Sequence, residues 1–331
     1  MIQTQDLMVP AQPSSRPVYG SDQPADKYGG FRAWAARRPV TAFLVLAFGI
    51  ACPVMALPAL AEHGVISDGW MPQLPGLDTE RIASVLLVFV ALLPAALWVT
   101  WAVDGPAGVR TLVGRMFRWQ IGARWWLVVL AALPTLTITI ALLMGDSFTP
   151  VEIGPFVATQ LLGLLVNLLL INIWEEAAWS GVVQTRLERR HGIVAAALLT
   201  AVPFALVHMP LHFIGPFSPA SLVTVLVALL VICALVRVMI GVVLRGTRDS
   251  ILAVALLHTL FNRSNNDEGL VASLTDGDAR GLAGLLAVLL LTTVVAVFSR
   301  HRLRRSYRHD LDDSALSTGS PAEPARNREL T

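Results

Sequence analysis

The stretch Asn172-Ile173-Trp174-Glu175-Glu176-Ala177-Ala178-Trp179-Ser180-Gly181 places two adjacent carboxylates at the end of a long apolar run. The run begins at Pro155, and about 20 such residues in a helix are enough to cross a bilayer. A carboxylate near the bilayer centre costs at least about 2.5–3.5 kcal/mol, and two neighbouring carboxylates repel each other. Ionisable residues inside a membrane usually belong to a functional site. Glu175 and Glu176 are therefore the first candidates for such a site.

The composition of the whole chain is typical of a polytopic membrane protein. Of its 331 residues, 55% are hydrophobic and 15% are charged, and the mean hydropathy is +0.63. These values exclude an ordinary soluble domain, so we expect membrane lipids as partners and no nucleic acid. Cys52 and Cys233 both lie in apolar runs, which favours neither a disulfide framework nor a metal site. The basic residues are almost all arginine, which points to a GC-rich genome and a bacterial source.

The apolar windows predict an all-α polytopic membrane protein with about eight transmembrane helices. We expect these helices at residues 41–60, 82–103, 125–143, 155–190, 193–208, 222–244, 250–262 and 281–298. At 1.5 Å per residue the fourth would be a single helix of roughly 50 Å that ends at His191-Gly192. A basic amphipathic segment, 104–124, between the second and third spans fits a helix lying on the membrane surface. Its arginines are Arg110, Arg115, Arg118 and Arg124.

Polar segments flank the membrane domain on both sides. We expect residues 1–38 and 300–331 to be disordered tails, because they are too polar to bury a core. The transmembrane domain between them would cover residues 39–299, with its polar motifs concentrated in about 155–265. Arginine clusters fall at alternate connections between spans, and the positive-inside rule then places both tails in the cytoplasm. The chain is thus expected to be a multi-pass protein of the cell membrane.

Other polar residues in the spans could join the two glutamates. His208 ends the fifth span, and Phe204 precedes it by four residues. His258 and Asn262 are also four apart, which puts them on one face of the seventh helix. At 1.5 Å per residue, Glu175 and His258 each lie roughly 15 Å from cytoplasmic arginines, whereas His208 lies about 27 Å from Arg190. That depth is too great for a straight helix to bring His208 to the glutamates.

Three short motifs occur in order along these spans: Glu175-Glu176-x-x-x-Ser180, Phe204-x-x-x-His208 and His258-x-x-x-Asn262. Together they resemble the intramembrane CAAX-protease and bacteriocin-processing family, also called the abortive-infection family. The motifs of that family read Glu-Glu-x-x-x-Arg, Phe-x-x-x-His and His-x-x-x-Asn. The resemblance covers about 90 residues of motif-bearing sequence and extends to the eight-span layout.

One position departs from the pattern of the family, because Ser180 stands where the family has arginine. A serine can donate one hydrogen bond to Glu176 but supplies no positive charge. Arg186 lies too far along the helix to replace that charge. Arg237, in the middle of the sixth span, is a candidate replacement.

The resemblance implies a hydrolase, an endopeptidase that cuts a peptide bond within the membrane. Glu175, helped by His208, would activate a water molecule as general base, and Glu176 would support the site. His258 and Asn262 would donate hydrogen bonds to the oxyanion. The substrate would be a peptide or a membrane protein.

The resemblance leaves the cofactor open. Glu175, His208 and His258 could bind a divalent metal such as zinc, with water in the fourth position, as in a metalloprotease. We favour a metal-free site, because the histidines come from different helices and lack the close spacing of His-Glu-x-x-His.

A second hypothesis comes from a different class of protein. The same buried polar cluster could serve binding or a proton relay in a non-catalytic or transport-like membrane protein. The serine at position 180 favours this alternative. Transporters more often contain two similar halves with broken helices, and the sequence has no such internal repeat.

Overall fold

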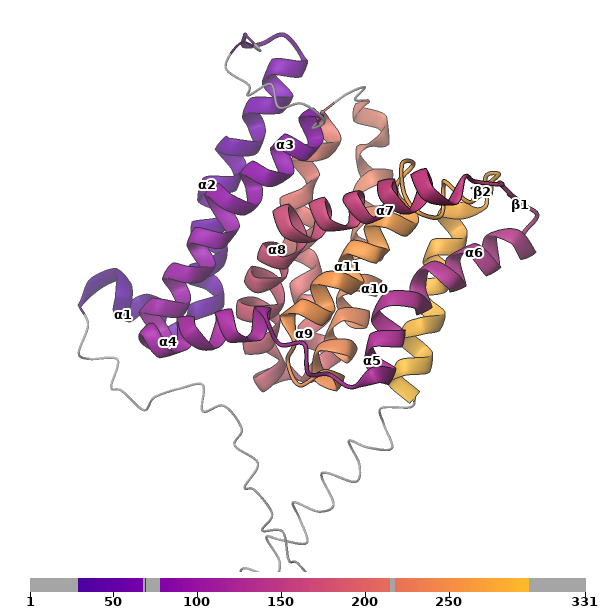
Figure 1. Ribbon diagram of the computed structural model, residues 1–331. Coiled ribbons are helices and arrows are strands. Elements are labelled where there is room, and N and C mark those ends of the chain that lie inside the picture. Colours follow the sequence, from indigo (N-terminus) through magenta and orange to yellow (C-terminus); the bar gives the residue numbers. More distant parts are fainter. Residues whose placement is uncertain (1–28, 68, 70–77, 215–217, 298–331) are drawn as a thin grey trace, which may run out of the picture.

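The computed structural model describes residues 29–67, 69, 78–214 and 218–297, and almost all of these are helical. The helices form one bundle (Figure 1). Their bounds are α1 Gly30–Arg37, α2 Pro39–Glu62, α3 Thr79–Leu86, α4 Leu93–Met116, α5 Ala123–Leu127, α6 Leu133–Leu143, α7 Ile153–Asn167, α8 Ile173–Ala178, α9 Thr185–His208, α10 Leu222–Gly246 and α11 Ile251–Asn265. A last helix covers Arg280–Val297. The predicted all-α class is confirmed.

Six helical segments within the described residues are long and apolar enough to cross a membrane, so the chain is a multi-pass membrane protein. They are Pro39–Glu62, Thr79–Met116, Ala123–Leu143, Ile153–Phe213, Leu222–Gly246 and Arg280–Val297. The fourth of them is interrupted at Gly192, where φ is 75° and the backbone leaves the helix. The chain turns at the residue pair predicted to end the fourth span, because glycine adopts this left-handed conformation without steric cost.

Several helices are joined end to end through π-helical turns rather than through loops. The turn η3 Leu87–Leu92 precedes Pro94, and the turn η4 Val128–Ala132 precedes Pro134. A proline ring clashes with the carbonyl four residues earlier and lacks an N–H. A wider π turn before each proline accommodates both effects without breaking the span.

The segment predicted as a single helix over 155–190 is helical throughout, but it bends and so does not extend about 50 Å in one direction. In Figure 1, α7 runs across the bundle, whereas α8 descends from the end of α7 into the bundle centre. The π turn η5 Leu168–Asn172 joins the two helices, and a second one, η6 Trp179–Gln184, lies between α8 and α9. The glutamates on α8 are therefore flanked by two π turns, which are frequent at functional sites.

Part of the predicted N-terminal tail is helical. Helix α1 packs its buried side chains Ala33 and Ala35 against α2 and α4, and Phe31 contacts the ring of Trp98. This aromatic and alanine-rich stretch has enough apolar surface to dock, which the reading of residues 1–38 as one polar tail overlooked. Residues 1–28 and 298–331, which contain the rest of both predicted tails, lie outside the described residues.

The arginines of the predicted surface helix do not all face the membrane surface. After Gly105, where φ is 67°, the last part of α4 runs along the lower edge of the bundle (Figure 1). Arg115 is nevertheless 2% exposed. Its guanidinium donates to the carbonyl oxygens of Asp249 and Gly181 at 3.1 and 3.3 Å and to the hydroxyl of Thr185 at 3.1 Å. Arg115 thus ties α4 to the helix that carries the glutamates.

A short strand pair went unpredicted. β1 Ser147–Phe148 pairs antiparallel with β2 Thr275–Asp276. Two residues per strand give no periodic sequence signal. The pair fixes the loop after α6 to the loop before the last helix.

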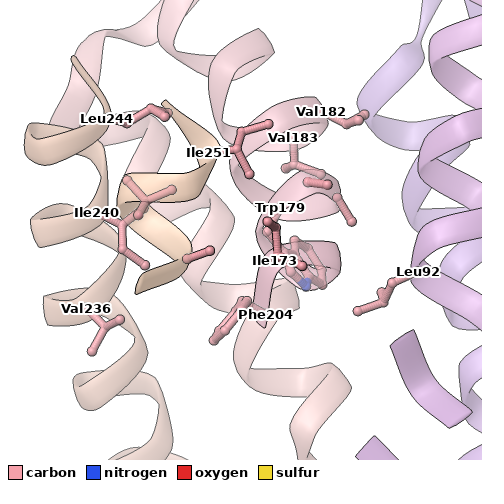
Figure 2. Packing of buried hydrophobic residues seen from close by; sticks show 14 of the residues in the cluster. Leu92, Ile173, Trp179, Val182, Val183, Phe204, Val236, Ile240, Leu244 and Ile251 are labelled. Carbon is pink, nitrogen blue, oxygen red and sulfur yellow. The ribbon is translucent and has the colours of Figure 1, made fainter. Parts of the chain in front are cut away.

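The core lies between α2, α4 and the helices from α8 to α11. Trp179 is fully buried and packs edge-on against Phe43 and Phe204, with ring centroids 5.4 and 5.5 Å apart. Figure 2 shows Trp179, Ile173 and Ile240 among the residues of this buried cluster. Gly181 lies two residues further on, where a Cβ would come within 2.5 Å of the Leu112 side chain. This close packing holds α8 rigidly in the bundle centre.

Candidate active site

The two glutamates lie side by side on α8 but have different surroundings. Glu175 is 3% exposed and lines a cavity, whereas Glu176 is fully buried and is not among the residues that line it. Burying two carboxylates is costly unless each is paired and hydrogen-bonded. The partners of each therefore indicate what it does.

Arg237 on α10 supplies the positive charge beside Glu176. Its Nη1 lies 3.0 Å from each carboxylate oxygen of Glu176, and both side chains are fully buried. The Ser180 hydroxyl donates to Glu176 Oε2, and Arg237 Nη2 donates to that hydroxyl oxygen at 2.9 Å. The candidate replacement thus contacts the carboxylate that the arginine of the family motif would face.

A further residue, Gln184, completes this network. Its Oε1 accepts hydrogen bonds from Arg237 Nε and Nη2 at 3.0 and 2.6 Å. Its Nε2 donates to the Arg237 carbonyl oxygen at 3.2 Å and to Glu188 at 3.2 Å. Sequence reasoning missed Gln184, although a signal was present: polar residues recur every four positions at Glu176, Ser180, Gln184 and Glu188. Residues four apart share one helix face.

His208 is the partner of Glu175. Its Nε2 lies 3.2 Å from Glu175 Oε1, while its Nδ1 lies 2.6 Å from the carbonyl oxygen of Phe204. A carbonyl oxygen can only accept, so Nδ1 carries a hydrogen and Nε2 faces the carboxylate. A hydrogen bond between Nε2 and Glu175 then requires a proton on one of these two groups. The pair is thus arranged to share and transfer a single proton.

The structure corrects the depth predicted for His208. Counted from the turn at Gly192, Glu175 lies 17 residues before it and His208 lies 16 residues after it. At 1.5 Å per residue both are about 25 Å from the turn. The sequence estimate measured the two residues from different arginines, Arg186 and Arg190, and so placed them at different depths.

His258 on α11 contacts both carboxylates. Its Nδ1 lies 2.9 Å from Glu176 Oε1 and 3.8 Å from Glu175 Oε2. With Nδ1 directed at Glu176, the Nε2 edge of the ring is left for other partners. The side chain is 6% exposed and lines the same cavity as Glu175.

Asn262 lies one helical turn after His258 and also lines the cavity. Its Nδ2 is 3.5 Å from Oδ1 of Asn172, a long contact. Asn172 in turn donates to the hydroxyl of Thr259 at 2.9 Å. Asn172 and Thr259 are fully buried, and Asn172 also lines the cavity, so this chain of polar groups holds Asn262 in the cavity wall. The roles of Asn172 and Thr259 in positioning Asn262 were not visible in the motif.

The cavity that Glu175, His208, His258 and Asn262 share has a volume of about 290 Å³. One wall is apolar and comes from α10. The mouth is polar, and across it Arg81 on α3 pairs with Glu268 at 2.7 Å. The cavity therefore connects the buried polar groups to charged surface residues. Further lining residues are Leu229, Ile232, Cys233, Val236, Asp78, Glu80 and Asn266.

The metal ligands considered from sequence are Glu175, His208 and His258. Among the described residues, no group of three or more His, Cys, Asp or Glu side chains is placed to hold a metal ion. His208 Nδ1 contacts a backbone carbonyl oxygen and its Nε2 faces Glu175, while His258 directs Nδ1 at Glu176.

Comparison with known families bears directly on this site. Residues 157–264 match the family described as type II CAAX prenyl endopeptidase Rce1-like. The chain carries an Rce1-like domain of this protease family. The matched residues span α7 to α11 and so include every residue of the three motifs. No curated protein matches the chain.

The match confirms the family recognised from the three motifs and the prediction that the chain is a protease of the CAAX type. In the Rce1-like domain, the buried cluster of Glu175, Glu176 and His258 is consistent with the active site of an intramembrane protease. The match does not extend to metal dependence.

Proposed function

We propose that the protein is an intramembrane endopeptidase in which Glu175, assisted by His208, activates a water molecule. The observation that carries the proposal is the convergence of Glu175, His208, His258 and Asn262, from three helices, on one cavity. Water in the cavity would lose a proton to Glu175 and attack the carbonyl carbon of the scissile peptide. A carboxylate paired with an imidazole at 3.2 Å suits this general-base role.

The tetrahedral intermediate would carry its negative charge on the former carbonyl oxygen. His258, as an imidazolium ion with Nδ1–H on Glu176, would donate through Nε2–H to that oxygen, and Asn262 would donate through Nδ2–H. Each donor would contribute about 2.7–4 kcal/mol. When the intermediate collapses, the C–N bond breaks and the proton held by Glu175 and His208 passes to the leaving amine nitrogen. Glu176, fixed by Arg237 and Ser180, holds the ring of His258 in place.

The network around Arg237 also bears on the alternative of a non-catalytic or transport-like protein. The main support for that alternative was that Ser180, which carries no charge, stands where the family motif has arginine. Because Arg237 contacts the same carboxylate, the departure from the family motif does not leave Glu176 unpaired. The endopeptidase therefore remains the function that this site favours.

We further propose eight membrane crossings with both termini in the cytoplasm. The turn at Gly192 divides the segment Ile153–Phe213 into two spans, and α11 adds another. Helix α1 and the end of Arg280–Val297 lie on the lower side of Figure 1, as does the last part of α4, which we interpret as the surface helix. The positive-inside rule makes this arginine-rich side cytoplasmic.

The substitution Glu175→Gln tests the catalytic assignment, because it keeps the volume and removes the base. A membrane substrate co-expressed with the wild-type protein should be cut, and cleavage by the variant should fall by at least about 100-fold. Cleavage at the full rate with Glu175→Gln would refute the proposal. Accumulation of an uncut membrane peptide or protein in a deletion strain would identify the substrate.

A further inference from the structure

A second cavity, of about 380 Å³, shares no lining residue with the first. It lies at the end of the helix that turns at Gly192. Arg186 in its wall is 11 residues beyond Glu175, which is roughly 16 Å along the helix axis. Its walls come from the start of α2, from the residues before the kink of α4 and from the helix end before Gly192. We refer to it as the basic pocket.

Positive charge dominates the basic pocket. Five arginines line it, and its acidic side chain, Asp104, pairs with Arg186. The five are Arg37, Arg38, Arg186, Arg189 and Arg190. Among the described residues, the side chains of Arg37, Arg38 and Arg190 have no ion-pair partner. Like charges drawn together from separate segments repel, so this concave arrangement favours an anion at its centre.

The backbone adds to this preference. Helix α2 begins in the wall of the pocket with Pro39, Val40 and Thr41, and no side chain caps its first turn. The first N–H groups of a helix have no partner within the helix, and its N-terminus carries a partial positive charge. The N–H groups of Val40 and Thr41 are thus available to the same anion that the arginines attract.

The surroundings place the basic pocket at a membrane surface. Aromatic side chains gather beside it on α1 and α4, where Phe31 stacks on Trp34 and contacts Trp98. The guanidinium of Arg32 lies 4.4 Å from the ring centre of Trp101. Phe31 and Trp101 are 48% and 43% exposed. Exposed aromatic residues of this kind are typical of the headgroup level of a bilayer.

We propose that the basic pocket binds the phosphate of an anionic phospholipid, such as phosphatidylglycerol. Arginine is suited to phosphate because its planar guanidinium can donate two parallel hydrogen bonds. The apolar helix α2, 24 residues long, starts at the pocket and would lie along the acyl chains of the bound lipid. Such a lipid would join the start of α2 to the end of the helix that carries the glutamates. The inference does not depend on the catalytic assignment.

Purified full-length protein in a neutral detergent provides the test, because no membrane surface then attracts the lipid nonspecifically. Phosphatidylglycerol would be titrated while bound lipid is counted by native mass spectrometry and the midpoint of thermal unfolding is followed. Phosphatidylcholine and inorganic phosphate are titrated in parallel. The test variant is Arg37→Gln/Arg190→Gln. The matched control is Arg110→Gln/Arg124→Gln, which removes the same charge from exposed arginines outside the pocket.

Phosphatidylglycerol should bind the wild-type protein and raise its unfolding midpoint, and neither phosphatidylcholine nor inorganic phosphate should do so. The pocket variant should bind phosphatidylglycerol at least about tenfold more weakly, and the control less than about threefold. Equal losses in the two variants would mean a general attraction to positive charge and would overturn the assignment. If inorganic phosphate stabilised the protein as much as phosphatidylglycerol does, the occupant of the basic pocket would be a soluble anion and the lipid proposal would be wrong.

Discussion

Arg237 and Glu176 form a buried ion pair between α10 and α8, with Nη1 of the arginine 3.0 Å from both carboxylate oxygens. The Ser180 hydroxyl bridges the two side chains, because it donates to Glu176 and accepts from Arg237 Nη2. In the family motif the cation belongs to the same helix as the glutamate, four residues later. Here the cation comes from a neighbouring helix, so the pair also fixes how α10 packs against α8.

The first prediction concerns the loss of this cation. Arg237→Met should lower the free energy of unfolding by about 3–5 kcal/mol, because it leaves a buried carboxylate without its partner. Unfolding in mixed detergent–SDS micelles measures the change. Activity should fall as well, since Glu176 positions His258.

A matched rescue variant distinguishes a charge effect from lost packing. Ser180→Arg/Arg237→Ala returns the guanidinium to the position it has in the family motif and vacates space on α10. It should be more stable than Arg237→Met and should recover part of the activity. Ser180→Arg alone should be destabilising, because position 180 is fully buried and overpacking costs about 1–3 kcal/mol. A double variant no more stable than Arg237→Met would contradict the role given to the cation.

The second prediction separates the two glutamates. Glu176→Gln should cost about 3–5 kcal/mol of stability, since it leaves Arg237 buried without a counter-charge. Glu175→Gln should unfold close to the wild type, because the partners of Glu175 are a histidine and the cavity, and should lose activity instead. Thermal unfolding and cleavage assays on both variants test whether stability depends on Glu176 and activity on Glu175. The reverse pattern would exchange the roles of the two residues.

The three motifs were predictable because each places polar side chains in an apolar run, where a membrane makes them costly. Spacing of four residues then put His258 and Asn262 on one face of a helix, and both line the cavity. The end of the predicted fourth span also agrees with the turn at Gly192. These features depend on local sequence alone.

Features that depend on how helices pack were not predictable from the sequence. Arg237 stands in the middle of an apolar helix, which marked it as unusual, but its distance to Glu176 depends on the contact between α8 and α10. The bend between α7 and α8 arises from the π turn η5. This turn contains no proline, so the sequence gives no signal for the bend. Arg115 was assigned to the membrane surface by its basic neighbours, and only the tertiary contacts with Gly181 and Thr185 show it to be buried.

The third prediction tests the oxyanion donor. Asn262→Ala should lower kcat by about 10²–10³-fold with little change in KM, because the hydrogen bond forms only in the transition state. Asn265→Ala is the matched control on the same helix, since Asn265 donates to the Phe261 carbonyl oxygen and does not line the cavity. It should leave kcat within about threefold of the wild type. An unchanged kcat for Asn262→Ala would remove this residue from the mechanism.

The fourth prediction concerns metal. Exhaustive treatment with EDTA and 1,10-phenanthroline, followed by desalting, should leave cleavage activity unchanged, because the proposed mechanism uses Glu175 and His208 to activate water and needs no metal ion. Elemental analysis of the purified protein provides an independent reading. Activity that disappears on chelation and returns with zinc would show that Glu175, His208 and His258 rearrange to bind it.

The last prediction tests on which side of the membrane the active-site cavity opens. Its mouth contains Glu268, whose side chain is 75% exposed, whereas exposed His191 marks the turn at the opposite end of the helix that carries the glutamates. Because arginines surround that turn, the positive-inside rule assigns His191 to the cytoplasm and Glu268 to the outer side.

Single cysteines at these two positions, in a Cys52→Ser/Cys233→Ala background, would be labelled with a membrane-impermeant maleimide. In intact cells Glu268→Cys should react and His191→Cys should not, and permeabilised cells should label both. The outer-facing mouth would then make substrates accessible from the outer side of the membrane. Labelling of His191→Cys alone in intact cells would invert the topology, so that the cavity would open to the cytoplasm.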